Sequence, residues 1–257
     1  MRKFIRISSA VSLLVIGLTF SALAGPAWAA METRQGPGLV VVELFTSQSC
    51  SSCPPADKFL GELAKRKDVL ALSMHVDYWN ALGWRDSWSS PKVTARQRRY
   101  SRALGTRYVS TPQAIIQGRA YAVGSDRTAI TRAIDNARRR SSARVQPLVS
   151  MTGPDGLTVK LPAGSPGNEA TVWLVVFDDG HTVNIGAGEN SGATITYTNV
   201  VRELRPIGSW NGKAKSITVD ISNEQAAGYG NCAILVQAKG SGTILGAISL
   251  PMRSGPR

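Results

Sequence analysis

The sequence has few cysteines, few histidines and few acidic residues. Its 257 residues include three cysteines and two histidines. Three cysteines are too few for a disulfide-stabilised scaffold, and two histidines argue against a histidine-based multi-metal site. The 17 acidic residues are outnumbered by 30 Lys and Arg, which gives a net charge of +13. Such a charge is typical of nucleic-acid-binding proteins, but no motif of that class accompanies it, so we expect no nucleic-acid partner.

Long apolar runs are also scarce, and the clearest one lies at the N-terminus. It covers residues 10–24, follows three basic residues, and precedes the small-x-small pattern Ala27-Trp28-Ala29. The run is short for a membrane span, which needs about 20 residues. We therefore predict a signal peptide over residues 1–29, cleaved near Ala29, and a periplasmic or secreted location in a bacterium. An uncleaved N-terminal anchor is the alternative.

The excess positive charge lies in one half of the chain. Residues 30–144 carry 19 basic and 9 acidic residues, whereas residues 145–257 carry 8 of each. The hydrophobic pattern changes at the same place, from mixed helix and strand periods to short β-branched runs. We predict an α/β domain over 30–144, an antiparallel β-sandwich-like domain over 145–250, and a flexible tail over 251–257.

The first half has the predicted element order β-α-β-α-β-β-α. The expected strands are 39–45, 69–76, 113–117 and 120–123, and the expected helices are 54–67, 91–104 and one capped by Ser125. Turn residues divide the second half into about eight strands, and Asp179-Gly180 is interpreted as one of its hairpin turns. The arginines of 91–104 and 138–140 are expected to form a solvated basic face. Contact with an anionic membrane surface or an acidic partner is the alternative.

The sequence Cys50-Ser51-Ser52-Cys53 stands between the first strand and the first helix. Two cysteines with this spacing can close a disulfide, and the N-terminus of a helix stabilises a thiolate, the form that attacks other disulfides. A structural disulfide or a metal site is the alternative, but so short a loop gives a disulfide little stabilising effect. The pattern therefore favours a redox-active disulfide that needs no other cofactor.

This element order, with the two cysteines after the first strand, resembles the thioredoxin fold, and Thr111-Pro112 precedes the third strand as in that family. The resemblance implies a cis peptide at Pro112 and a substrate peptide that pairs with the backbone of Thr111. It also implies that Glu43 assists proton transfer at Cys53. The residue before Cys50 and the two serines differ from ordinary thioredoxins, which leaves the redox direction open.

Four segments narrow the resemblance further. They are ELFTSQSCSSCPPAD (43–57), HVDYWNALGWRD (75–86), STPQAI (110–115) and GENSGATITYTNVVRELRPIGSW (188–210). Together they resemble the exported bacterial proteins of the DUF1223 family, over about residues 40–250. The resemblance implies mainly a fold, because the name of the family itself states that the function of its members is unknown.

Three further features of the sequence each allow a structural or a functional interpretation. The loop after the second strand holds Trp79, Trp84 and Trp88, which form either an aromatic wall for an apolar substrate peptide or a plug between the two halves. His75 is either a core histidine or a ligand of copper or zinc together with both cysteines. Cys232 is either a buried inert thiol or a resolving cysteine.

These observations favour an exported thiol–disulfide oxidoreductase that acts on protein or peptide thiols. Cys50 would form the mixed disulfide with the substrate and Cys53 would resolve it, while an unidentified redox partner recycles the pair. The alternatives are a copper- or zinc-handling protein and a non-catalytic binding module of the cell envelope.

Overall fold

The computed structural model describes residues 38–140, 145–153 and 155–252. The predicted signal peptide, residues 141–144 and most of the predicted tail lie outside the described residues. No helix within the described ranges is long and apolar enough to cross a membrane.

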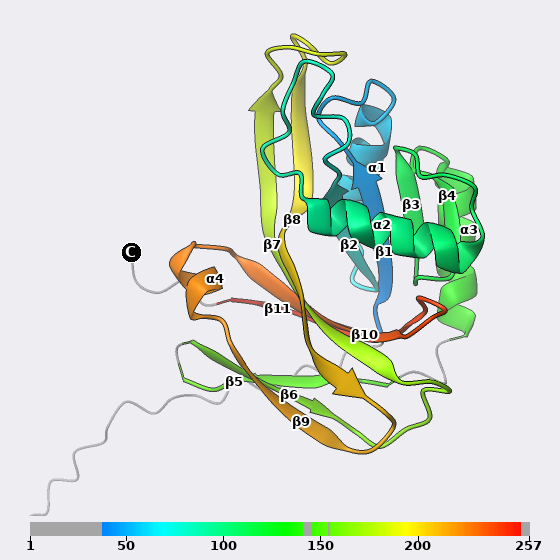
Figure 1. Cartoon of the computed structure of the whole chain (residues 1–257), viewed down its shortest axis with the longest axis vertical. Coiled ribbons are helices and arrows are strands. Elements are labelled where there is room, and N and C mark those ends of the chain that lie inside the picture. Colours follow the sequence, from blue (N-terminus) through cyan, green and yellow to red (C-terminus); the bar gives the residue numbers. More distant parts are fainter. Residues whose placement is uncertain (1–37, 141–144, 154, 253–257) are drawn as a thin grey trace, which may run out of the picture. The chain divides into compact units, whose positions relative to one another are not determined.

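Eleven strands and four helices make up the described chain (Figure 1). The first part contains β1 (Val40–Thr46), α1 (Pro54–Ala64), β2 (Val69–His75), α2 (Pro91–Leu104), β3 (Gln113–Ile116), β4 (Ala120–Val123) and α3 (Arg127–Arg139). The second part contains β5 (Leu148–Met151), β6 (Gly156–Leu161), β7 (Ala170–Asn184), β8 (Thr194–Trp210), β9 (Lys215–Asp220), α4 (Ser222–Ala226), β10 (Asn231–Ala238) and β11 (Ile244–Pro251). The predicted α/β class is confirmed.

One large, mainly antiparallel sheet contains strands from both parts of the chain. Its order is β11-β10-β7-β8-β2-β1-β3-β4, and β5-β6-β9 form a second sheet. Among the neighbouring strands of this sheet, two pairs are parallel: β1 with β2, and β2 with β8. Strands β2 and β8 pair at Ser73 and Val200. The predicted β-rich part therefore does not form a separate sandwich among the described residues, because four of its strands extend the sheet that begins with β1.

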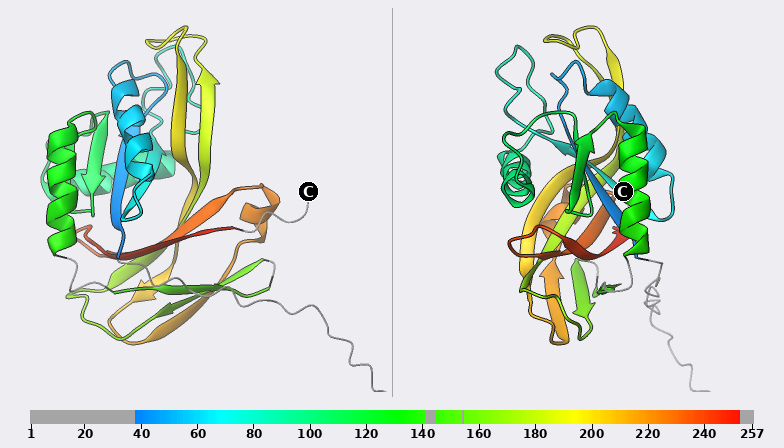
Figure 2. Two further views of the ribbon diagram at one scale, coloured as in Figure 1. Left: turned by 180° about the vertical axis from the view of Figure 1, so that it is seen from behind. Right: turned by 90° about the vertical axis from the view of Figure 1, so that its right-hand side faces the viewer.

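Helix α2 covers one face of the large sheet, whereas α1, α3 and the second sheet cover the other (Figure 2). Even-numbered residues of β1 pack against α1 and α3, while Val41 and Phe45 face the other side and pack with α2. The strands β5, β6 and β9 pack against β7 and β10 in a separate apolar cluster. The alternation along β1 follows from the pleat of a strand, which sends successive side chains to opposite faces.

The long hairpin of β7 and β8 departs from the sequence prediction. Asp179-Gly180 does not form the turn, because Gly180 pairs with Thr198 and the ladder continues to Asn184 and Thr194. The true connection is residues 185–193, which we call the cap. Figures 1 and 2 show that this hairpin end lies beside the loops that follow β1 and β2. The extra length of the two strands therefore carries the cap to the cysteine motif.

Candidate functional site

The predicted disulfide between Cys50 and Cys53 is present. The two Cα atoms are 5.4 Å apart, and Cys53 is the N-cap of α1. Prolines at the first two helical positions cost no hydrogen bond there, so the chain turns directly from the cysteine motif into the helix. Cys50 and Cys53 are 1% and 0% exposed, although the two serines between them are exposed. The motif is therefore at the surface while its sulfur atoms are covered.

Two side chains of the cap bind the backbone of the cysteine motif and of the residues just before it. The amide nitrogen of Asn190 donates to the carbonyl oxygens of Gln48 at 2.9 Å and Cys50 at 3.0 Å. The Glu189 carboxylate accepts the backbone N–H of Ser51 at 3.1 Å, and the hydrogen bonds from Ser51 lower the pKa of Glu189. These contacts join residues about 140 positions apart and fasten the cap across the cysteine motif.

The tryptophan loop holds the same segment from another side. Trp84 donates its indole N–H to the side-chain oxygen of Gln48 at 2.7 Å, and its backbone oxygen accepts from the Ser49 hydroxyl at 2.7 Å. Its ring also lies against Gly186 of the cap, where an added Cβ would come within 3.0 Å of it. Trp84 thus packs between the cap and the cysteine motif. Trp88 packs against the rings of His75 and Tyr197.

Thr111 and Pro112 lie close to the first turn of α1. Their peptide bond is cis, as the thioredoxin resemblance implies. A Cβ added to Gly124 would be 2.8 Å from the Pro112 Cβ and 3.0 Å from that of Ala56, so the proline ring is close to the helix that Cys53 caps. Trp79 donates its indole N–H to the Thr111 hydroxyl at 2.8 Å.

A cavity of about 350 Å³ opens next to Pro112. Tyr108, Tyr121 and Val123 line it, and each of these side chains is more than half exposed. Strand β4, which carries the last two, is an edge of the large sheet. An exposed apolar surface thus lies beside the cis-proline.

Glu43 lies on the face of the large sheet opposite α1. It forms a buried ion pair with Arg96 of α2, at 2.5 Å, and accepts a hydrogen bond from the Tyr100 hydroxyl. Glu43 shares the face of Val41 and Phe45, whereas α1 packs on Val40 and Leu44. The structure therefore does not bring Glu43 to Cys53, and Arg96 is a buried residue rather than part of a solvated basic face.

A different acid, Asp57, lies on the cysteine side of the sheet. It is one helical turn after Cys53, donates its backbone N–H to the Cys53 carbonyl at 3.1 Å, and is 2% exposed. Burial raises the pKa of Asp57 well above its ordinary value; the nearby Thr46 hydroxyl lowers it and the charge of Asp86 raises it further. The sequence offered one signal for Asp57, since an acid at this position shares the apolar face of the helix.

His75 and Asp86 form a second buried pair close to Asp57. Nδ1 of His75 lies 2.6 Å from the Asp86 carboxylate, and both side chains are fully buried. Burial raises the pKa of Asp86, but His75 and the N–H groups of Gln48 and Trp88 bring it below its ordinary value. Nε2 of His75 has no hydrogen-bond partner among the described residues.

The predicted metal ligands are therefore engaged in other interactions. Both cysteines are in the disulfide, and His75 contacts Asp86. Among the residues that the structure describes, no group of three His, Cys, Asp or Glu side chains is arranged to hold a metal ion.

Cys232 lies in the apolar cluster between the two sheets. Its side chain is 0% exposed, and burial followed by the charge of Glu224 raises the pKa of its thiol to about 12. This is the environment of an unreactive core thiol.

Comparison with solved structures supports the fold and the family. A crystal structure of a protein from Agrobacterium tumefaciens is similar with 36% identity and a TM-score of 0.74, covering 87% of this chain and 99% of that one. HBP35 of Porphyromonas gingivalis is similar in fold alone, with 14% identity and a TM-score of 0.56, covering 84% of this chain and 76% of that one. None of the curated proteins matches significantly. The model of the DUF1223 family, described as proteins of unknown function, matches residues 41–237, so the chain belongs to the DUF1223 family.

Proposed function

We propose that this protein is a thioredoxin-like thiol–disulfide oxidoreductase whose reactive group is the Cys50–Cys53 pair. The observation that carries the proposal is the position of this disulfide between β1 and the N-terminus of α1, with cis-Pro112 close to the same helical turn. A structural role explains the disulfide poorly, because a bridge between residues three apart removes little entropy from the unfolded chain.

The exchange is a pair of sulfur displacements. A substrate thiolate attacks Sγ of Cys50, the Cys50–Cys53 bond breaks, and Cys53 leaves as a thiolate. A second substrate thiolate then attacks the substrate sulfur of the mixed disulfide and releases Cys50. The substrate dithiol is thereby oxidised to a disulfide, and the two cysteines are reduced and take up two protons. Transfer in the opposite direction uses the same intermediate, and a partner protein with its own disulfide or dithiol returns the pair to its starting state.

Asp57 replaces Glu43 in the proposed proton transfer. Its side chain is a neighbour of Cys53 on the buried face of α1, since residues four apart on a helix lie about 5–6 Å from each other. A carboxyl with a raised pKa holds a proton that can pass to the Cys53 thiolate when the disulfide opens. In the reverse reaction the carboxylate takes the proton from the thiol.

The substrate is proposed to be an extended peptide that lies across Thr111 and Pro112. The exposed side chains of Tyr108, Tyr121 and Val123 provide an apolar surface beside this position. The periplasmic or secreted location follows from the predicted signal peptide, and disulfides persist in such compartments.

The test is mixed-disulfide trapping by single-cysteine variants. Cys53→Ser should attack a peptide disulfide through Cys50, release one peptide thiol and accumulate the mixed disulfide with the other, Cys50→Ser should not, and Cys232→Ser should behave as the wild type. Equal trapping by the Cys50→Ser and Cys53→Ser variants, or none by any variant, refutes the proposal. Titration of the reduced protein with Zn²⁺ or Cu⁺ examines the metal-handling alternative, which uses both cysteines with or without His75.

A further inference from the structure

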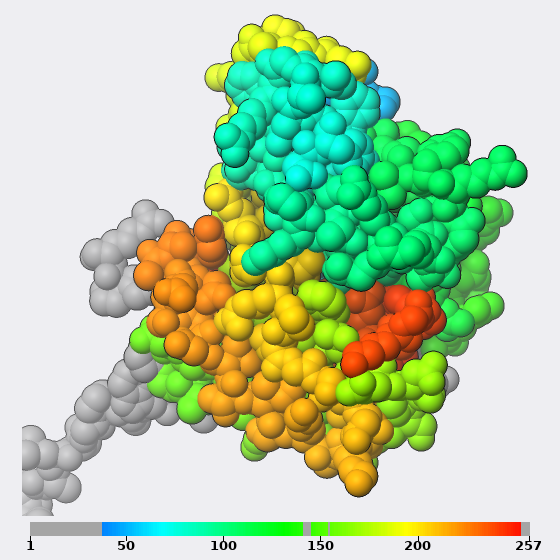
Figure 3. Space-filling model, viewed as in Figure 1, coloured from blue at the N-terminus to red at the C-terminus, as the bar shows by residue number. Residues whose placement is uncertain are grey.

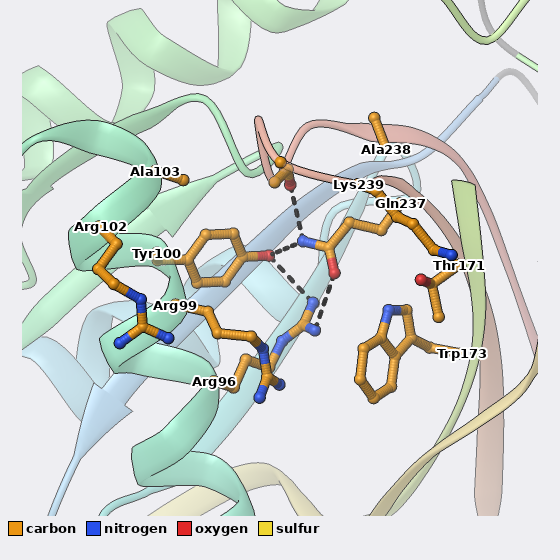
Figure 4. Close-up of a pocket in the computed structure, with 12 residues that line it drawn as sticks. Arg96, Arg99, Tyr100, Arg102, Ala103, Thr171, Trp173, Gln237, Ala238 and Lys239 are labelled. Atoms are coloured by element: carbon orange, nitrogen blue, oxygen red, sulfur yellow. Dashed lines mark hydrogen bonds between the residues drawn. The ribbon is translucent and has the colours of Figure 1, made fainter. Parts of the chain in front are cut away.

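A second cavity lies far along the chain from the cysteine motif, between α2 and the strands β7 and β10. Its volume is about 390 Å³. Figure 3 shows the surface of α2 next to that of the red segment that begins β11, and Figure 4 shows the cavity with α2 on one side and Thr171 and Trp173 on the other. The cavity opens on the α2 side of the sheet, whereas α1 covers the opposite face.

The inner end of this cavity is a rigid network with balanced charge. Arg96 pairs with Glu43 through two nitrogens and donates to Gln237 at 3.1 Å. The Gln237 amide nitrogen donates to the Tyr100 hydroxyl at 2.9 Å and to the carbonyl of Gly242 at 2.7 Å (Figure 4). Arg96 and Tyr100 bind the Glu43 carboxylate directly, and Glu43 only partly offsets the burial and the neighbouring charges that lower the pKa of Arg99.

The outer part carries positive charge without a matching acid. Arg99 and Arg102 stand one turn apart on α2, and neither forms an ion pair with any acid that the structure describes. Partial burial lowers the pKa of Arg99, and the neighbouring charges of Arg96 and Arg102 lower it further. Lys239, on the opposite rim, is held by Glu169. An anion between Arg99 and Arg102 would relieve the repulsion between their positive charges.

Trp173 lies in the same wall. The Arg99 guanidinium lies over its ring, 5.5 Å from the centroid, which holds the side chain of Arg99 along the wall. The indole N–H of Trp173 is buried and has no acceptor among the described residues. Because this nitrogen is not exposed to the cavity, Trp173 contributes to the site through its ring, which holds Arg99 in place.

We propose that this cavity binds a small organic anion through a carboxylate or phosphate group placed between Arg99 and Arg102. Guanidinium groups present paired N–H donors that match the oxygens of both groups. The volume exceeds the need of an inorganic ion and lies in the range of small-molecule sites, so the ligand is a metabolite-sized molecule rather than a simple ion.

Calorimetric titration with two probes tests the proposal. Inorganic pyrophosphate represents the phosphate group and citrate the carboxylate, each added up to about 10 mM, where a ligand of millimolar affinity saturates the site. We expect saturable binding of at least one probe to the full-length protein. The probe that binds identifies the chemical group.

Matched variants separate a built site from general attraction to a basic protein. Arg99→Gln with Arg102→Gln should weaken binding about tenfold or more, the size expected for the loss of two charge-assisted contacts. Arg98→Gln with Arg132→Gln removes the same charge from positions that do not line the cavity and should change affinity less than about twofold. Trp173→Leu keeps the net charge and should weaken binding by removing the aromatic ring over which Arg99 lies. No saturable binding of either probe, or an equal loss in both double variants, overturns the proposal.

Discussion

The cap over the cysteine motif gives a quantitative prediction for the replacement Asn190→Ala. Asn190 is 9% exposed and donates to two backbone oxygens, those of Gln48 and Cys50. A typical hydrogen bond contributes about 0.5–1.5 kcal/mol net, so the two together hold the cap closed by about 1–3 kcal/mol. Cys50 is 1% exposed, and we expect that the cap must open before an attacking thiolate reaches its sulfur. Asn190→Ala should therefore accelerate reduction of the disulfide by about 5-fold to 150-fold at 25 °C.

The assay follows the reduction of the Cys50–Cys53 disulfide by dithiothreitol. Samples are quenched with a maleimide of known mass, and mass spectrometry counts the thiols that have been freed at each time. Ser191→Ala is the matched control, because the Ser191 hydroxyl donates within the cap to Gly186 and makes no contact with the cysteine motif that the structure records. The control should reduce at the wild-type rate. If the Asn190 variant is folded and reduces no faster than the wild type, the cap does not limit access to Cys50.

Three further predictions concern buried titratable groups. Glu43→Gln should destabilise the protein by about 3–5 kcal/mol in chemical denaturation, because it leaves the Arg96 charge buried without its partner; replacing both by apolar residues of similar size should recover most of the loss. Asp57→Asn should raise the melting temperature at pH 8 but not near pH 4. The pKa of Asp57 is higher in the folded state than in the unfolded state, so the folded state holds the proton more tightly. The wild type therefore loses stability as the pH rises above the unfolded-state pKa of Asp57, and the asparagine variant does not. A melting temperature that is unchanged at pH 8 would contradict this. Cys232, whose thiol pKa is raised to about 12, should remain unmodified by iodoacetamide at pH 8 in the native protein and react once the chain is unfolded.

Local signals in the sequence predicted the three helices of the first part, although the first ends at Ala64 rather than at residue 67 and the third is capped by Asp126 rather than by Ser125. The helix predicted over 91–104 is confirmed at both ends, because its boundaries depend on neighbouring residues alone. The Ser90 hydroxyl accepts the Lys92 N–H at 3.2 Å, and Gly105 ends the helix with a φ of 67°. A glycine at this position adopts the left-handed conformation without the steric cost that a side chain would add.

The covering of the site and the role of Glu43 depended on contacts that such signals do not report. An acid within an apolar strand can face either side of a sheet. Glu43 faces the α2 side, where its ion-pair partner Arg96 lies, and Arg96 is 53 residues later in the chain. The hairpin prediction at Asp179-Gly180 was wrong because the ladder between β7 and β8 outweighs the turn preference of this dipeptide. The cap reaches Cys50 only as a consequence of that longer ladder.

The sheet shared by both parts of the chain has a consequence for how the protein folds. Strand β2 lies between β1 and β8, and the apolar cluster beneath α2 combines residues of β1 and β2 with residues of β7, β8 and β10. Pairing of segments more than 120 residues apart, such as Ser73 and Val200, brings a large entropic cost before it brings stability and slows folding. A chain that ends before β7 would expose the open edge of β2 and the apolar side chains that β7, β8 and β10 cover, and would aggregate rather than fold. The cysteine motif and the β-rich part should therefore melt in a single cooperative transition.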